Sequence, residues 1–163
     1  MAISRKDKGF SLIELLIVVA IILIIAAIAI PNLLRSRIAA NEASAVGSIR
    51  TINTAEVTYS SSYPDCGFTT LANLGGSGGN TTGAGLIDSV LANNVKSGYS
   101  FAAFPSGGSG ACGAGAGTPN STYYVTGAPQ SPQTGQRYFF SDQSGVIRYN
   151  TSTAATATSA PLQ

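Results

Sequence analysis

An unbroken apolar segment dominates the first third of the chain. From Leu15 to Ile30 no residue is charged or hydroxylated, and over residues 10–30 the only charge is Glu14. About 20 apolar residues are enough to span a bilayer as a helix. The pattern therefore predicts a membrane-spanning helix over residues 10–30, with one carboxylate close to its start.

The position of Glu14 has two interpretations. A carboxylate in the middle of a membrane helix costs roughly 2.5–3.5 kcal/mol on insertion scales, so an acidic residue in such a segment suggests a function. Glu14 is also close enough to the end of the segment for its side chain to reach the head groups. Position alone does not separate these two interpretations.

The apolar pattern becomes one-sided after Ile30 and continues to about Ser62. Apolar residues then recur at intervals of three, four or seven, which predicts an amphipathic helix over residues 31–62. Pro31 removes a hydrogen bond from a helix interior, so it either kinks one long helix or links two shorter ones. We expect one kinked helix, roughly 75 Å long at 1.5 Å per residue, that ends before Pro64. The apolar positions are Leu34, Ile38, Ala45, Ile49 and Ile52, and the charges expected largely elsewhere on the helix are Arg35, Arg37, Glu42, Arg50 and Glu56.

Residues 63–150 show a different pattern, which predicts one small domain. Residues 75–85 and 107–117 are rich in glycine and read as surface loops. Alternation and aromatic residues predict an antiparallel sheet that packs on the amphipathic half of the helix, an α+β fold. The Ser/Thr/Ala-rich tail, residues 151–163, is expected to be disordered. The predicted elements are a short helix at 86–91 and strands at 99–104, 123–126, 137–141 and 146–150, the last two forming a hairpin around Asp142–Gly145.

The charges of residues 1–9 predict the orientation of the apolar segment. Arg5, Lys6 and Lys8 outnumber Asp7, and the positive-inside rule keeps such an end in the cytoplasm. A secretory signal peptide cleaved near Ala27–Ala29 is the alternative. It is disfavoured because the apolar core is at the upper length limit and Glu14 interrupts its front.

The segment Gly9–Asn32, GFSLIELLIVVAIILIIAAIAIPN, resembles the class III signal of type IV pilins and the related pseudopilins. The resemblance implies that residues 1–9 are a leader, which a membrane prepilin peptidase cuts between Gly9 and Phe10 before it methylates the new amino group of Phe10. It also implies a pilin-like fold with one long N-terminal helix. Glu14 would pair with the Phe10 amine of a neighbouring subunit in a helical homo-oligomeric filament. The likeness is strongest up to Asn32 and fades after about Tyr63.

Physical arguments support these implied roles. An unpaired carboxylate buried among neighbouring helices costs several kcal/mol, whereas a paired one costs far less, so Glu14 and an amine can fix the axial register. Gly9 suits a protease subsite that requires close approach of the backbone. Without residues 1–9 the chain carries six basic and six acidic side chains, and subunits without net charge do not repel one another.

The resemblance implies two functions that share this N-terminus. The first is a type IV pilin, a subunit of a surface pilus or fimbrium that serves cell adhesion, twitching motility or DNA uptake. The alternative is a major pseudopilin of a type II secretion system, which drives protein export through a periplasmic filament. We favour the pilin, because such pseudopilins commonly carry an acidic calcium loop near the C-terminus and this chain has one acidic residue after position 90, Asp142. In both cases the subunit begins in the bacterial inner membrane and is assembled by an ATPase and a platform protein.

The remaining chemistry of the chain is sparse. Cys66 and Cys112 are the only cysteines and are predicted to lie outside the cytoplasm, so we expect a disulfide between them. The chain contains no histidine, no phosphate-binding Gly-Lys-Ser/Thr element and no paired acids. We therefore expect no enzyme activity, cofactor, metal or nucleotide. The N-x-S/T matches at Asn80, Asn120 and Asn150 arise easily by chance in so Ser/Thr-rich a chain, and the aromatic residues are assigned to the core.

Overall fold

The computed structural model describes residues 10–109, 112 and 117–162. Its first element is one long helix, α1, which runs from Leu12 to Ser62 and contains Pro31 in its interior. The chain divides into two compact units, residues 1–36 and 37–163. Because α1 continues through Pro31, the alternative of two helices joined by a linker is wrong, and the kink itself stays a prediction.

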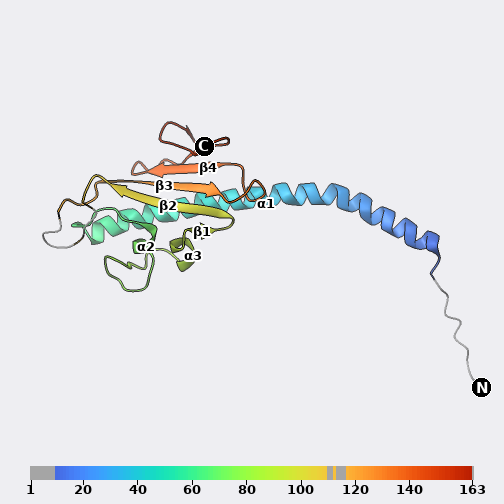
Figure 1. The fold of residues 1–163 in the computed structure, drawn as a ribbon, viewed down its shortest axis with the longest axis horizontal. Coiled ribbons are helices and arrows are strands. Elements are labelled where there is room, and N and C mark those ends of the chain that lie inside the picture. The colour runs from blue at the N-terminus through green and yellow to red at the C-terminus, as the bar shows by residue number, and fades with distance from the viewer. Residues whose placement is uncertain (1–9, 110–111, 113–116, 163) are drawn as a thin grey trace, which may run out of the picture. The chain divides into compact units, whose positions relative to one another are not determined.

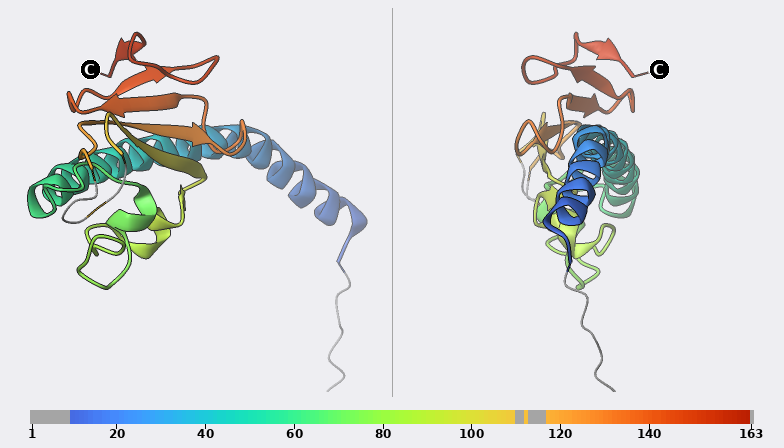
Figure 2. Two further views of the ribbon diagram at one scale, coloured as in Figure 1. Left: turned by 60° about the vertical axis from the view of Figure 1, so that its left-hand side comes forward. Right: turned by 90° about the vertical axis from the view of Figure 1, so that its right-hand side faces the viewer.

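The second unit is built on an antiparallel sheet, as expected for an α+β fold. Its strands follow one another in the order β1-β2-β3-β4-β5-β6, each paired with the next along the chain. Figures 1 and 2 show β2, β3 and β4 side by side along the second half of α1. The elements of this unit besides α1 are α2 (Leu71–Leu74), α3 (Ser89–Ala92), β1 (Val95–Lys96), β2 (Tyr99–Ser106), β3 (Thr122–Pro129), β4 (Tyr138–Asp142), β5 (Arg148–Asn150) and β6 (Ala160–Pro161).

The core lies between the sheet and α1. Along the strands, every second side chain is buried, as the alternation predicts. Burying a large apolar side chain contributes about 1.5–3 kcal/mol, so these residues account for much of the stability of the unit. They include Ile49, Ile52 and Tyr59 from α1 and Tyr99, Phe101, Tyr123, Val125 and Phe139 from the strands.

Gly127 on β3 lies against the Ile49 side chain of α1. A Cβ at this position would lie 3.3 Å from Ile49 Cδ1 and 3.3 Å from the Phe101 ring. A side chain here would require Ile49 or Phe101 to shift by a few tenths of an ångström, and glycine permits the tight packing seen here.

The four predicted strands are confirmed, and two short ones were missed. β1 joins β2 through Ser97 and Gly98, which have φ of 52° and 73°, the positive values that a two-residue hairpin of type I′ requires. The predicted helix at 86–91 begins later, at Ser89, because the Asp88 carboxylate accepts the Leu91 N–H and caps it. α2 was not predicted.

The expectation of a disordered tail is wrong. β6 pairs with β5, and the Leu162 N–H donates to the Ile147 carbonyl. Ala155 is buried, and Leu162 is packed against the core. Composition alone suggested disorder, but backbone pairing at the free edge of β5 orders the segment.

Glu42 and Glu56 were expected largely away from the apolar face of the helix, and this is also wrong. Both carboxylates are buried in the structure, Glu42 at 6% and Glu56 at 0% exposure. They continue the steps of three and four residues made by Ala45, Ile49 and Ile52, so they lie on the same stripe of α1. The spacing of these residues therefore predicts that Glu42 and Glu56 lie on the buried face of α1, although their charge suggests an exposed position.

Candidate functional site

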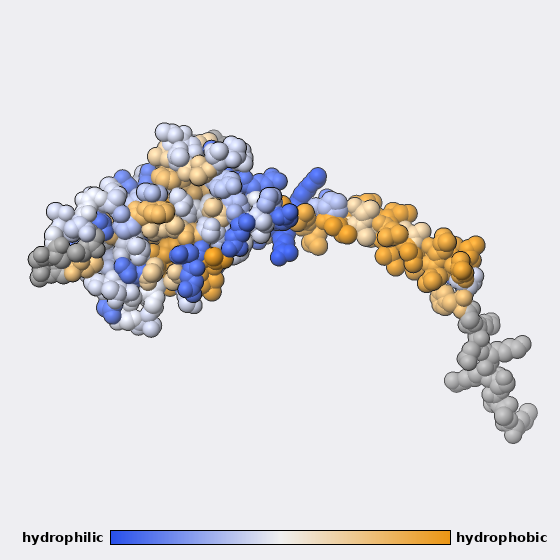
Figure 3. Space-filling view, in the orientation of Figure 1, coloured by the Kyte–Doolittle hydropathy of each residue, from blue (hydrophilic) through white to orange (hydrophobic). Residues whose placement is uncertain are grey.

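The first half of α1 presents apolar side chains in all directions. Large hydrophobic residues from Phe10 to Leu34 are between 43% and 81% exposed, and Figure 3 shows hydrophobic surface covering this part of the helix. α1 is the one helix in the described residues that is long and apolar enough to cross a membrane, a statement about length and composition alone. So large an exposed apolar surface indicates a membrane or protein partner.

Glu14 caps the helix to which it belongs. α1 begins at Leu12, and Glu14 Oε2 accepts the Ser11 backbone N–H at 2.9 Å. This is half of the capping box that Ser-x-x-Glu produces at a helix start. The Ser-x-x-Glu pattern of residues 11–14 is the sequence signal for this cap, which the membrane and register interpretations of Glu14 leave out.

The residues of the predicted processing site are only partly within the described chain. Gly9 and the leader, residues 1–9, lie outside the described residues. Phe10 is 81% exposed. An exposed position just before a helix start is accessible to an enzyme, which fits the expected cleavage and methylation at Phe10.

Cys66 and Cys112 are joined in a disulfide, as predicted. The bond connects the segment after α1 with the loop between β2 and β3, with the two Cα atoms 4.6 Å apart. Cys66 itself is buried, and the Tyr59 hydroxyl on α1 lies 3.9 Å from Cys112 Sγ. The disulfide therefore ties the loop between β2 and β3 to the chain just after the end of α1.

The buried carboxyl of Glu56 holds the segment that follows Cys66. Its Oε2 accepts the Thr69 N–H at 3.0 Å, while Oε1 is buried without a hydrogen-bond partner in the described part of the chain. Burial raises the pKa of Glu56 to about 7, which outweighs the lowering effect of the Thr69 bond. Burial, and then the charge of Glu56, raise the pKa of Tyr123 to about 12. Glu56 is therefore a structural group whose protonation follows pH near neutrality.

The asparagine of an N-x-S/T match, the aromatic residues and the potential metal ligands do not form a common site in the described part of the chain. Asn120 is buried, and its side chain donates to the Phe68 carbonyl, so it has a structural role. Aromatic residues do face solvent in one row across the sheet, where Phe104 and Tyr124 lie 4.8 Å apart and Tyr124 and Phe140 lie 5.7 Å apart, both stacked. Within the described residues there is no cluster of three or more potential metal ligands.

Comparison with known proteins identifies the N-terminal segment. Residues 4–30 match the family model described as the prokaryotic N-terminal methylation motif. The chain is 66% identical over 38 residues to the type IV wide pilus major component PilA4 of Thermus thermophilus, which covers 23% of this chain and 29% of the relative. It is 42% identical over 62 residues to the type IV major pilin protein PilA of Myxococcus xanthus, which covers 36% of this chain and 28% of the relative. These alignments therefore span less than a third of each relative, and no solved structure matches the chain.

Proposed function

We propose that this chain, a member of the type IV pilin family by its N-terminal segment, is a structural subunit of a type IV pilus filament. The observation that carries the proposal is the division of α1 into two different surfaces. Up to Leu34 its large apolar side chains are exposed, whereas Ala45, Ile49, Ile52 and Tyr59 in its second half are buried in the core of the second unit. The first half therefore needs a partner, and the second half already has one.

A bilayer and a bundle of identical helices both satisfy such a surface. Before assembly, residues 10–30 lie in the bacterial inner membrane, where about 20 apolar residues match the thickness of the hydrocarbon. After assembly, the same residues pack against those of other subunits in the core of an extracellular fibre. In both settings the head, residues 63–150, together with the tail, remains outside the cytoplasm.

Processing at the N-terminus prepares the subunit for assembly. Prepilin peptidase cuts between Gly9 and Phe10 and methylates the Phe10 amine, which is supported by the match of residues 4–30 to the methylation motif. Cleavage removes three basic residues and one acidic residue and leaves a chain without net side-chain charge. Repulsion between subunits is thereby removed at the step that precedes assembly.

Glu14 sets the register between subunits. In the single chain its carboxylate accepts one backbone N–H, from Ser11, and a carboxylate has acceptor sites left for a further donor. The Phe10 amine of a neighbouring subunit is a cation that can use them. Only one axial offset brings the two groups together, so the pair selects one arrangement among otherwise similar apolar contacts.

The pilus is supported over the secretion pseudopilus by two observations. Both relatives described above are named as type IV pilus components. After position 90 the chain has one acidic residue, Asp142, which is too few for an acidic calcium loop. An assembly ATPase and a platform protein are the machinery expected to polymerise the subunit.

The test is mass spectrometry of the mature chain combined with electron microscopy of the cells that produce it. We expect a methylated Phe10 at the N-terminus and long fibres that contain this chain outside the cell. A mature N-terminus near Ile30, which a secretory signal peptide would produce, contradicts the proposal. Short filaments confined to the periplasm would support the pseudopilin instead.

A further inference from the structure

In the second unit, residues 37–163, some charged side chains have hydrogen-bond or ion-pair partners and others have none. Arg137 pairs with Glu42 and Lys96 pairs with Asp88, and the Arg148 guanidinium donates to the Ser159 carbonyl. Asp142 accepts the Ser144 N–H. Within the described residues, Asp65 is the one carboxylate that accepts no hydrogen bond and forms no ion pair. Arg37 and Arg50 on α1 are the cations of the second unit that likewise have no hydrogen-bond or ion-pair partner there.

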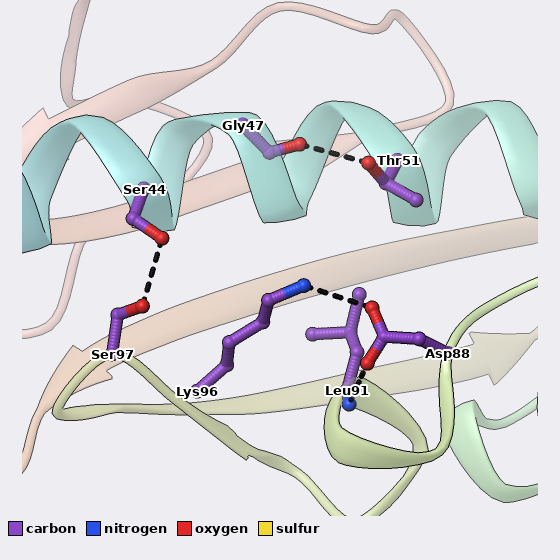
Figure 4. Close-up of polar contacts among 7 residues, drawn as sticks. All are labelled: Ser44, Gly47, Thr51, Asp88, Leu91, Lys96 and Ser97. Carbon is purple, nitrogen blue, oxygen red and sulfur yellow. Dashed lines mark hydrogen bonds and ion pairs between the residues drawn. The ribbon is translucent and has the colours of Figure 1, made fainter.

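Arg50 lies at a groove along the exposed side of α1. The groove has a volume of about 340 Å³ and is lined by Arg50, Thr51, Thr54, Ala55, Thr58 and Leu86. One turn before it, a Cβ added to Gly47 would meet nothing within 4 Å, so this side of the helix is open. Figure 4 shows the adjoining part of α1, where the Thr51 hydroxyl donates to the Gly47 carbonyl and Ser44 is hydrogen-bonded to Ser97.

The side chains that line the groove are short enough for another molecule to come close to α1. The hydroxyls of Thr51, Thr54 and Thr58 donate to the carbonyls of Gly47, Arg50 and Thr54, four residues earlier in the helix. These hydroxyl protons are therefore engaged in hydrogen bonds within α1, and the threonine side chains lie against the helix. The Arg50 guanidinium has five donors and no partner within the described part of the chain, so it is the group that can select a ligand, and a carboxylate suits its geometry.

Asp65 is held on a rigid turn at the end of the same helix. The Cys66 N–H donates to the Tyr63 carbonyl at 3.0 Å, which closes a four-residue turn with Pro64 at its second position, where proline is favoured. The disulfide to Cys112 fixes the last residue of this turn. The carboxylate of Asp65 is therefore displayed at a defined place and is exposed.

Arg50 and Asp65 of one chain are too far apart to pair with each other. The helix continues for twelve residues after Arg50 and ends at Ser62, which corresponds to about 18 Å at 1.5 Å per residue. A contact between two different patches of identical molecules is heterologous, and it forms open helical arrays when the rotation does not close a ring. A filament needs a contact of this type.

We propose that the groove at Arg50 receives the turn Tyr63–Cys66 of a second copy of this chain, with Asp65 of that copy paired to Arg50. This inference rests on the proposed function, because the contact joins copies head to tail. It adds a polar contact between the second units of two copies to the apolar contacts between the first halves of their helices. The groove at Arg50 and the turn that carries Asp65 both lie on the second unit. The contact can therefore form only when the second units of two copies are offset along the fibre.

The first experiment is zero-length crosslinking of the full chain with a carbodiimide, in the variant Arg50→Lys, which keeps the charge and introduces a reactive amine. An amide forms between this amine and the Asp65 carboxylate with loss of water, which the carbodiimide takes up. We expect a ladder of dimers and larger species on a denaturing gel, and the linked peptide in the mass spectrum. The ladder is lost when Asp65→Asn is added.

The pair Lys96 and Asp88 provides an internal control, since its atoms are 2.8 Å apart within one chain. It should give the same intrachain crosslink in every variant and no dimer. A ladder that persists with Asp65→Asn, or that links the groove to another protein, overturns the inference.

The second experiment exchanges the charges. Arg50→Asp and Asp65→Arg should each reduce the amount of fibre at least tenfold while leaving the melting temperature unchanged, because both side chains are exposed. The two changes in one chain should restore fibres. If the native chain forms fibres and the exchanged chain does not recover, this inference alone fails. If the native chain forms no fibres, the proposed function fails and this inference fails with it.

Discussion

Arg137 and Glu42, 95 residues apart in the chain, form a buried polar connection between α1 and the loop that leads into β4. The guanidinium Nε donates to Glu42 Oε2 at 2.7 Å, while Oε1 accepts the backbone N–H groups of Gln136 and Arg137. Glu42 is 8% exposed and Arg137 is 40% exposed as side chains. The carboxylate is therefore a buried anchor with three donors, and the loop before β4 is fixed to the helix by it.

Glu42→Ala is expected to lower the free energy of unfolding by about 2–3 kcal/mol, since it leaves the backbone donors without their acceptor. Arg137→Met should cost less, about 1 kcal/mol, because the guanidinium is partly in water and the two backbone bonds to Glu42 remain. Thermal and urea unfolding followed by circular dichroism measure both effects. Lys96→Met is the matched control and should change stability by less than about 0.5 kcal/mol, because its ion pair is exposed.

Glu56 is expected to make the head more stable in mild acid. Burial raises its pKa from 4.5 to about 7, so between these values the folded chain holds a proton that the unfolded chain has released. The stability is fully present below about pH 4.5, falls as the pH rises to about 7 and is constant above it. The loss amounts to about 3 kcal/mol. The chain has no histidine, so few other groups titrate in this range.

Urea unfolding at several pH values between 4.5 and 8 checks this prediction. Glu56→Gln keeps an acceptor for the Thr69 N–H and cannot ionise, so its stability should not fall across this range. The difference between the two proteins should be largest above pH 7. Parallel curves for the native chain and Glu56→Gln would show that the carboxyl does not titrate as expected.

Glu14→Gln separates the two roles of this side chain. Glutamine can also accept the Ser11 N–H in a capping box, but it carries no charge to pair with the Phe10 amine. We therefore expect normal insertion and cleavage and at least a tenfold loss of fibres, measured by immunoblotting of sheared cell surfaces. Glu14→Ala should lose the cap as well and assemble no better. Abundant fibres from Glu14→Gln would mean that the charge does not set the register.

Removal of the disulfide is expected to destabilise the head strongly. The bond spans 46 residues, and closing a loop of this length contributes about 4 kcal/mol in the chain-entropy model. The double variant Cys66→Ser with Cys112→Ser should melt at a lower temperature than the native chain, and reductant should lower only the native value. The native chain should also migrate differently on gels with and without reductant. Equal melting temperatures for the two proteins would show that the loop is held by other contacts.

The sequence by itself determined the elements whose formation depends on neighbouring residues. The apolar run from Leu15 to Ile30 is long enough to specify a helix and to predict a membrane or protein partner without any tertiary contact. Alternation predicted strands β2 to β5, although it placed some of their ends up to three residues too early or too late. The extracytoplasmic position predicted for Cys66 and Cys112 was enough to expect their bond.

The tertiary structure decided how charged and weakly patterned residues are used. Glu42 and Glu56 are buried because the positions they occupy on α1 face the sheet, and the donors that compensate Glu42 come from a loop more than 90 residues later. The residues of β6 have no strand pattern and are ordered by the free edge of β5. Local sequence sets backbone preference and hydrophobic period, whereas the cost of burying a charge depends on partners that only the folded chain brings together.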